Sequence, residues 1–308
     1  MATAREIRKR IRSVKNIAQV TRALEAVSAS KVRRAQAQVL ATRPYAERAW
    51  YILLNLANQT GVSAATHPLL TEHADVEQIG LILLTGDRGL CGAFNINIVQ
   101  TAIEFVKAQG KPVRLITVGS KGRELMTRRG YNIAAEFSHL PSSPSIMDTT
   151  PIAWAAVDDF MQGRVSQVYL AYTDFINTLK QEPTVKRLLP LRMEKIETQA
   201  MGEYVEQVET GTWGEYIYEP SAQEIFDEVI PRFTELQVYQ AVLESLASEH
   251  SARMVAMRNA TENAQVLIED LTLSYNKARQ TAITSEILDI TGGAEALTAA
   301  KSHQQRGV

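Results

Sequence analysis

The chain has 308 residues, of which 45% are hydrophobic and 22% charged, as is ordinary for a soluble protein of one or two domains. Its single cysteine, Cys91, excludes an intramolecular disulfide framework, and no stretch approaches the roughly 18 apolar residues of a membrane-spanning helix. The net charge of −1 hides an asymmetry, because residues 1–43 carry eleven Lys and Arg against two acids. This basic segment predicts contact with an acidic surface, in the same chain or in a partner.

The first predicted element is a long amphipathic helix. Residues 1–43 contain neither Gly nor Pro, and apolar side chains recur at steps of three or four with one gap. This apolar stripe consists of Ile7, Ile11, Val14, Ile17, Leu24 and Val27. We expect the helix to run on towards Asn58, with a kink or a break at Pro44, because proline removes a helix hydrogen bond.

In the middle of the chain the apolar residues no longer recur at steps of three and four along long stretches. Short apolar runs rich in β-branched residues predict strands at 79–85, 113–118 and 168–172. The segments between them that are typical of helices are 95–109, 121–129 and 150–162. Strands that alternate with helices indicate βαβ units and a largely parallel sheet over about 76–200. The Pro- and Ser-rich stretch 138–150 is predicted as a loop, and 197–220 as irregular or strand-like.

The last element is a second long helix. Residues 232–291 contain no Gly or Pro, and a helix of that length would extend roughly 90 Å, beyond the roughly 50 Å diameter of a compact globule of this size. Its stripe alternates steps of three and four through Leu236, Tyr239, Leu243, Leu246, His250, Met254, Met257, Thr261, Ala264, Ile268, Leu271, Tyr275 and Ala278. This spacing predicts a coiled-coil seam, locally relaxed between Leu243 and Met254, and the alternative is a long helix lying on a domain.

Together these elements predict an α/β protein: an antiparallel coiled coil of long N- and C-terminal helices plus a Rossmann-like α/β domain in the middle. We divide the chain into an N-terminal shaft helix at 1–75, an α/β domain at 76–220 and a C-terminal shaft helix at 221–308.

Two glycine-containing turns are the first candidates for chemistry. The turn 86–92 (GDRGLCG) follows a predicted strand and precedes a helix, where doubly wound folds bind phosphate. It fits neither the dinucleotide fingerprint nor the P-loop, so a tight structural turn is the favoured interpretation. The alternative is that the turn binds phosphate in a nucleotide-binding α/β enzyme with a coiled-coil arm. The turn 119–122 (GSKG) has the same ambiguity, and we predict that Ser120 caps a helix.

No convincing active site or metal site emerges from the remaining residues. The five histidines lack ligand spacing, and no nucleophile elbow occurs. The basic segment 31–34 could bind nucleic acid, but it has no interleaved aromatic residues, so a solvated helix face and an acidic protein partner are the competing interpretations.

Several motifs, taken in order, resemble one family, the gamma subunit of F-type ATP synthases. They are ASKVR at 29–33, DRGLCG at 87–92, GSKG at 119–122, SEHSARM at 248–254, SYNKARQ at 274–280, and ITSEILD at 283–289 followed by Gly293-Ala294. The matches span nearly the whole chain, and the chain resembles bacterial members. The stretch 192–215 is somewhat longer than in simple bacterial members but lacks the cysteines of the chloroplast dithiol switch, and the tail 301–308 has no assigned role.

This resemblance implies a non-catalytic rotor shaft. The two terminal helices would turn inside a ring of alternating alpha and beta subunits and couple c-ring rotation to ATP synthesis or hydrolysis and hydrogen-ion transport. The implied partners are the alpha, beta and epsilon subunits and the c-ring, with no cofactor, no nucleic acid and membrane contact only through the complex. The implied location is peripheral, on the cytoplasmic face of the bacterial cell membrane.

The resemblance also implies roles for individual residues. Contacts to the beta subunit would come from Lys31, Arg33, Arg34, Arg279 and Gln280. A bearing tip would consist of Ile283, Glu286, Ile287, Leu288 and Ile290. The turns of the α/β foot domain, which would dock on epsilon and the c-ring, contribute Asp87, Arg88, Gly89, Gly92, Gly119 and Lys121.

Overall fold

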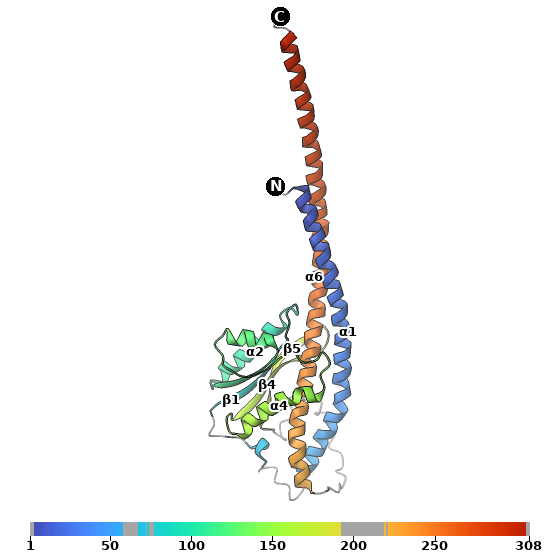
Figure 1. The fold of residues 1–308 in the computed structure, drawn as a ribbon. Helices are drawn as coiled ribbons and strands as arrows, with labels where there is room; N and C mark the ends of the chain where they lie inside the picture. The colour runs from blue at the N-terminus through green and yellow to red at the C-terminus, as the bar shows by residue number, and fades with distance from the viewer. Residues whose placement is uncertain are drawn as a thin grey trace. The chain divides into compact units, whose positions relative to one another are not determined.

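The computed structural model describes residues 3–57, 67–71, 73, 77–191, 219 and 221–305. The chain divides into two compact units, Met1–Glu25 with Met257–Val308, and Ala26–Ala256. Two long helices, α1 (Ala4–Ala57) and α6 (Ala222–Gln305), contribute to both units (Figure 1). The stretch 192–215, and all but residue 219 of the segment 197–220 predicted as irregular or strand-like, lie outside the described residues.

Both helices continue through residues that usually interrupt helices. The predicted kink or break at Pro44 does not end α1, because Ala46 and Trp50 bury their side chains beyond it and hold the next turns in place. Helix α6 begins at Ala222, before Pro231, and runs through Gly292 and Gly293. Glycine in a helix costs about 1 kcal/mol relative to alanine, which the flanking helix-forming residues offset.

In the unit formed by Met1–Glu25 and Met257–Val308, α1 and α6 lie side by side over the length that α1 covers (Figure 1). The hydroxyl groups of Thr21 and Thr261 are 2.7 Å apart in the seam. The seam side of α6 is buried at Met257, Thr261, Ala264 and Ile268. Every residue of the predicted α6 stripe is buried or half-buried. The predicted seam is confirmed from Met257 to Ile268, whereas Tyr239 and Leu246 pack against the α/β core, as expected for the alternative of a helix lying on a domain.

The predicted stripe of α1 is only partly right. Ile7 is buried and Ile11 and Val14 are half-buried, but the side chains of Ile17 and Val27 are 53% and 54% exposed. The seam instead continues through Ala18, Thr21, Ser28, Val32, Ala35 and Val39. Apart from a seven-residue gap between Thr21 and Ser28, these positions lie three or four residues apart, and the small and hydroxyl side chains among them carry no apolar signal in the sequence.

The unit Ala26–Ala256 contains one five-stranded sheet in the order β3-β2-β1-β4-β5. Its strands are β1 (Ile79–Leu84), β2 (Val113–Val118), β3 (Ile133–Phe137), β4 (Gln167–Phe175) and β5 (Gln181–Leu189). Strands β1 to β4 pair in parallel, and β5 is antiparallel to β4. The three predicted strands are confirmed. The edge strands β3 and β5 were missed because their side chains are mostly half-buried and form no apolar run.

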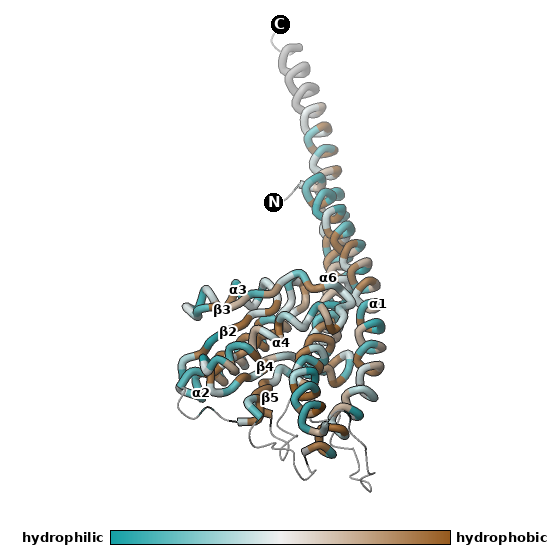
Figure 2. Tube along the Cα trace, turned by 60° about the horizontal axis from the view of Figure 1, so that its bottom comes forward, coloured by the Kyte–Doolittle hydropathy of each residue, from teal (hydrophilic) through white to brown (hydrophobic). Residues whose placement is uncertain are grey.

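Helices cover both faces of this sheet (Figure 2). They are α2 (Phe94–Gln109), α3 (Ser120–Thr127) and α4 (Ile146–Met161), with a short helix η2 at Pro68–Leu70. Apolar side chains of α2 and α3 pack on one face, while α4, α6 and the C-terminal part of α1 pack on the other. The predicted loop 138–150 is wrong over its last residues, because the carboxylate of Asp148 accepts the backbone N–H of Ser145 at 2.8 Å and starts α4 at Ile146. The predicted α/β fold with a Rossmann-like middle is confirmed.

Candidate interaction surfaces

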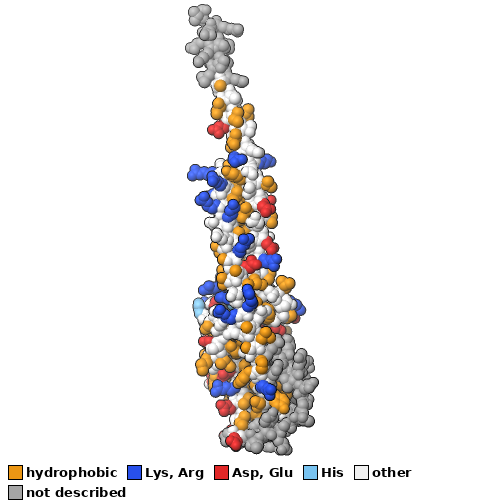
Figure 3. Space-filling view, turned by 90° about the vertical axis from the view of Figure 1, so that its right-hand side faces the viewer, with side chains coloured by type: hydrophobic (Ala, Val, Ile, Leu, Met, Phe, Trp, Pro, Cys, Tyr) orange, Lys and Arg blue, Asp and Glu red, His pale blue; other side chains and the backbone are white. Residues whose placement is uncertain are grey.

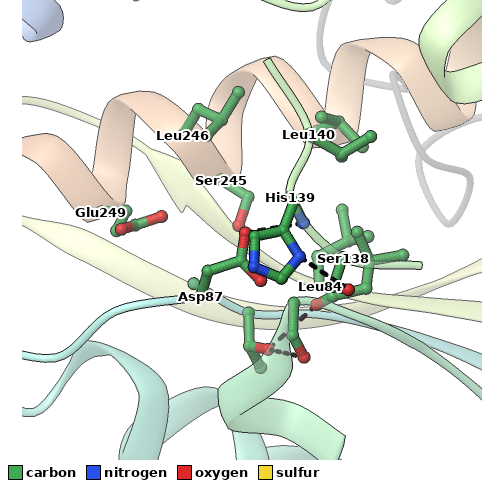
Figure 4. A pocket seen from close by; sticks show the side chains of 13 residues that line it. Leu84, Asp87, Ser138, His139, Leu140, Ser245, Leu246 and Glu249 are labelled. Atoms are coloured by element: carbon green, nitrogen blue, oxygen red, sulfur yellow. Dashed lines mark hydrogen bonds between the residues drawn. The ribbon is translucent and has the colours of Figure 1, made fainter. Parts of the chain in front are cut away.

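The turn 86–92 lies where β1 and β2 end and α6 passes. Figure 4 shows Asp87 and His139 beside α6, from which Ser245 and Glu249 project. One carboxylate oxygen of Asp87 accepts the backbone N–H and the hydroxyl of Ser120 at 2.9 and 3.0 Å, and the other accepts the backbone N–H of His139 at 3.0 Å. Partial burial by itself would raise the pKa of Asp87, but these hydrogen bonds outweigh it and hold the pKa below its usual value. Asp87 is therefore an ionised structural anchor between β1, α3 and the segment after β3.

This carboxylate occupies the position that a phosphate would take at the N-terminus of α3. Gly119, not Ser120, is the capping residue, so the prediction that Ser120 caps the helix is wrong by one position. Gly119 has φ 94°, and a Cβ there would lie 2.1 Å from the carbonyl oxygen of Thr85. The cavity beside the turn has a volume of about 50 Å³, far below the several hundred Å³ of a typical ligand site. The geometry favours the structural interpretation of both turns over nucleotide binding.

The other residues of the two turns serve the same local structure. Lys121 pairs with Glu124 at 2.7 Å, and its backbone N–H donates to the carbonyl of Gly86. Gly92 takes the left-handed conformation, with φ 57°. Arg88 and Gly89 are exposed, and their carbonyl oxygens face Arg253 of α6.

The predicted basic contact on α1 is not one surface. Arg33 and Arg34 are exposed, whereas Lys31 is half-buried beside the seam. His250 of α6 is buried, and its burial, together with the charges of Lys31 and Arg253, lowers its pKa to about 4. Arg33 and Arg34 are therefore the side chains available to a partner, and Lys31 faces α6.

The predicted contact and tip residues of α6 lie on the part of the helix beyond the seam. After Ala278, every side chain described up to residue 294 is exposed, including Arg279, Gln280 and Glu286. The apolar residues of this segment are Ile283, Ile287, Leu288 and Ile290, which are 49%, 55%, 64% and 67% exposed. Figure 3 shows hydrophobic side chains near the upper end of the described part of the molecule and Lys and Arg side chains below them on the same face. Exposed branched aliphatic residues in such number mark an interaction surface.

Arg253 and Glu249, to which the sequence assigned no role, connect α6 to the 86–92 turn. Arg253 donates to the carbonyls of the 86–92 turn and pairs with Glu249 at 2.6 Å. The motif SEHSARM contained both residues, but only the fold places them against a turn more than 150 positions earlier in the chain.

Within the described part of the chain, no group of three or more potential ligands is placed to hold a metal ion. Across the same residues, none of the helices combines the length and the apolar character needed to span a bilayer.

Comparison with known proteins covers nearly the whole chain. A family model described as ATP synthase matches residues 3–297. The ATP synthase gamma chain of Chloroflexus aurantiacus is 46% identical over 301 residues, covering 97% of this chain and 100% of that one. The ATP synthase gamma chain of Herpetosiphon aurantiacus is 47% identical over 305 residues, covering 96% and 99%.

A solved structure shares the fold. One chain of the Euglena gracilis mitochondrial ATP synthase, in an OSCP, F1 and c-ring assembly, superposes with a TM-score of 0.64 at 19% identity, covering 97% of this chain and 95% of that one. At nearly full length and more than 45% identity to the Chloroflexus and Herpetosiphon proteins, the chain belongs to the ATP synthase gamma chain family.

Proposed function

We propose that the chain is the central rotor shaft of an F-type proton-translocating ATP synthase. It couples rotation of the c-ring to the conformational cycling of the catalytic beta subunits, and it carries no active site of its own. The observation that carries the proposal is the end of α6, where the seam stops at Ala278 and exposed branched aliphatic residues follow. In a member of this family, that surface fits the collar of a surrounding ring.

A single chain suits this role because it cannot be threefold symmetric. Each of three identical catalytic subunits meets a different face of the shaft, so their nucleotide affinities differ. To move one site from 1:99 to 99:1 between two states takes about 5.5 kcal/mol of differential interaction. At about 25 cal/mol per Å², this corresponds to roughly 220 Å² of apolar burial, which one helix face can supply.

The surfaces then take separate tasks. Arg33 and Arg34 contact the acidic lever loops of beta subunits, with Lys31 supporting them from the edge of the seam. Arg279 and Gln280 hydrogen-bond a catalytic-subunit loop, and the apolar tip is the group Ile283, Ile287, Leu288 and Ile290, with Glu286 among them.

The remaining assignments follow from the same role. Segments 1–75 and 221–308 form the shaft, and 76–220 forms the foot that docks on epsilon and the c-ring. The turns of Asp87 and Gly119 shape this foot from inside, through their hydrogen bonds and close packing. The chain reaches the membrane only through the complex, on the cytoplasmic face of a bacterial membrane.

A reversible cross-link tests the shaft directly. A cysteine introduced as Arg33→Cys, in a Cys91→Ser background, is paired with one in the lever loop of a beta subunit in the assembled complex. Oxidation should stop ATP hydrolysis, because a bonded shaft cannot turn past the next subunit, and reduction should restore it. The matched control is Glu104→Cys, which is exposed on α2 and should leave hydrolysis unaffected by oxidation. Full turnover with the Arg33→Cys bond intact would rule out rotation of this chain.

A further inference from the structure

The contact between the 86–92 turn and α6 is made by two charged side chains that are largely buried. Arg253 pairs with Glu249 at 2.6 Å, and their side chains are only 14% and 11% exposed. The guanidinium of Arg253 also donates to the carbonyl oxygen of Gly89 at 3.3 and 3.4 Å and to that of Arg88 at 3.5 Å. One arginine thus links two successive carbonyls of the turn to α6.

The turn and the helix also approach each other closely on the same helix face. A Cβ built on Gly86 would lie 2.8 Å from the carboxyl carbon of Glu249, so a larger residue there would displace this carboxylate. A Cβ built on Gly92 would lie 4.0 Å from the Cβ of Ala256. The contacts at 249, 253 and 256 are spaced four and three apart, as residues on one face of a helix must be.

The same turn is fixed to the rest of the α/β domain. The carboxylate of Asp87 binds the N-terminus of α3 and the backbone of His139. The side chain of Asn95 accepts the backbone N–H of Gly86 at 2.8 Å, which fixes the turn to α2. A displacement of the turn relative to α6 would therefore carry the end of the sheet, α2 and α3 with it.

We propose that Glu249 and Arg253 are positioning residues that hold the α/β domain at a fixed rotational position on α6. This inference rests on the proposed shaft function. Apolar packing between α6 and the sheet is non-directional, and Ser248 and Ser251 each donate only one neutral hydrogen bond to the α/β domain, whereas the charged guanidinium of Arg253 donates to two carbonyls. A buried ion pair is a weak source of stability but fixes geometry, so its loss should affect torque transfer more than folding.

The test is the double variant Glu249→Gln/Arg253→Gln, which removes both charges and leaves neither one buried alone. It is assembled into the complete complex and measured for protons transported per ATP hydrolysed, with the unfolding midpoint of the free chain measured in parallel. We expect hydrolysis to continue while the transport ratio falls at least twofold. The control is Arg258→Gln/Glu262→Gln, an exposed ion pair of the same spacing on α6, which should keep the native ratio.

A disulfide supplies a second and independent measurement. The Cβ separation of 4.0 Å between positions 92 and 256 lies within the range of natural disulfides, so Gly92→Cys/Ala256→Cys in a Cys91→Ser background can bond the turn to the helix. A side chain at φ 57° is strained in the oxidised and the reduced chain alike, so the comparison of the two forms isolates the effect of the bond. In the charge-free double variant, oxidation should restore the transport ratio and reduction should lower it again. With Glu249 and Arg253 intact, oxidation should leave the turnover rate unchanged, because the joint does not move during rotation.

The outcomes separate the two proposals. A native transport ratio in the charge-free variant, or a loss of turnover when the 92–256 disulfide forms in the otherwise native chain, would overturn the fixed joint while the shaft function stands. A native chain that supports no coupled transport in the assembled complex would overturn the shaft function and the joint with it.

Discussion

At the scale of single residues, polar side chains of α6 fix how this helix contacts the α/β domain. Along the face that meets the α/β domain, Ser248 donates to the carbonyl of Thr173 at 3.1 Å, and Glu235 accepts the indole N–H of Trp154 at 3.0 Å. Ser248, Thr173 and Glu235 are buried, so each of their polar groups would be costly without a partner. Such directional contacts select one register of helix against sheet, which apolar packing by itself does not.

His250 is the residue whose protonation should govern acid stability. It is 6% exposed, and its Nε2 atom has no hydrogen-bond partner among the described residues. Its pKa is lowered to about 4 in the folded chain, from about 6.5 unfolded, by burial first and then by Lys31 and Arg253. Between these two pKa values His250 binds a proton in the unfolded state but not in the folded state. Its contribution to the free energy of unfolding is therefore fully present above pH 6.5 and is lost as the pH falls towards 4.

We predict that this single group costs the folded chain about 2 kcal/mol of unfolding free energy between pH 7.5 and pH 5. Urea unfolding of the full chain at the two pH values measures the loss. The variant His250→Gln cannot titrate and should lose less stability over the same interval by about that amount. An identical pH dependence in the two chains would contradict the assignment.

At the scale of elements, the seam between α1 and α6 follows spacing more than hydrophobicity. Ile17 and Val27 look like core residues in the sequence but are exposed, and Ala18, Thr21 and Ser28 take the seam positions instead. The partner helix decides between these two stripes, because knobs of α1 must enter holes of α6 at alternating steps of three and four. For α6 the stripe read from the sequence is buried or half-buried at every position, because regular spacing and mostly apolar side chains coincide there, but its first part packs on the α/β core and only its later part forms the seam.

A pair of matched charge substitutions tests this seam. Ala264→Glu places a carboxylate at a position that is 7% exposed and should destabilise the chain by about 2 kcal/mol or more. Ile17→Glu makes the same charge change at a position that is 53% exposed and should cost well below about 1 kcal/mol. The unfolding midpoint of the helical circular dichroism signal compares them. Equal destabilisation by both substitutions would indicate that Ile17 lies in the seam and would contradict this prediction.

At the scale of the whole molecule, the exposed basic side chains and the exposed apolar side chains lie on different segments. The segment 1–43 carries eleven bases, and the free end of α6 carries exposed isoleucine and leucine side chains. Electrostatic attraction acts over about 10 Å in 0.1 M salt and guides association, whereas apolar contact acts only on touching surfaces. The basic surface should therefore govern capture by an acidic ring, and the apolar tip the fit inside it.

Charge reversal tests the basic surface. We expect Arg33→Glu/Arg34→Glu to weaken association of the full chain with a ring of alpha and beta subunits about tenfold or more at 50 mM salt, with a smaller difference at 300 mM because salt screens exposed charges. The control Lys107→Glu/Lys111→Glu makes the same charge change at exposed positions of the α/β domain. Binding measured by sedimentation should separate the two variants. Equal weakening in both would assign the effect to net charge and not to Arg33 and Arg34.

The sequence by itself determined the two long helices, the alternating strands and helices between them, and the family, because helical spacing, β-branched runs and local motifs are all short-range signals. It also indicated that the turn 86–92 is structural, from glycine spacing that fits no phosphate motif. Only the tertiary structure decided which stripe of α1 faces the seam, that β3 and β5 complete the sheet, and that Arg253 and Glu249 hold the turn against α6. Each of these depends on contacts between residues far apart in the chain, which no local pattern encodes.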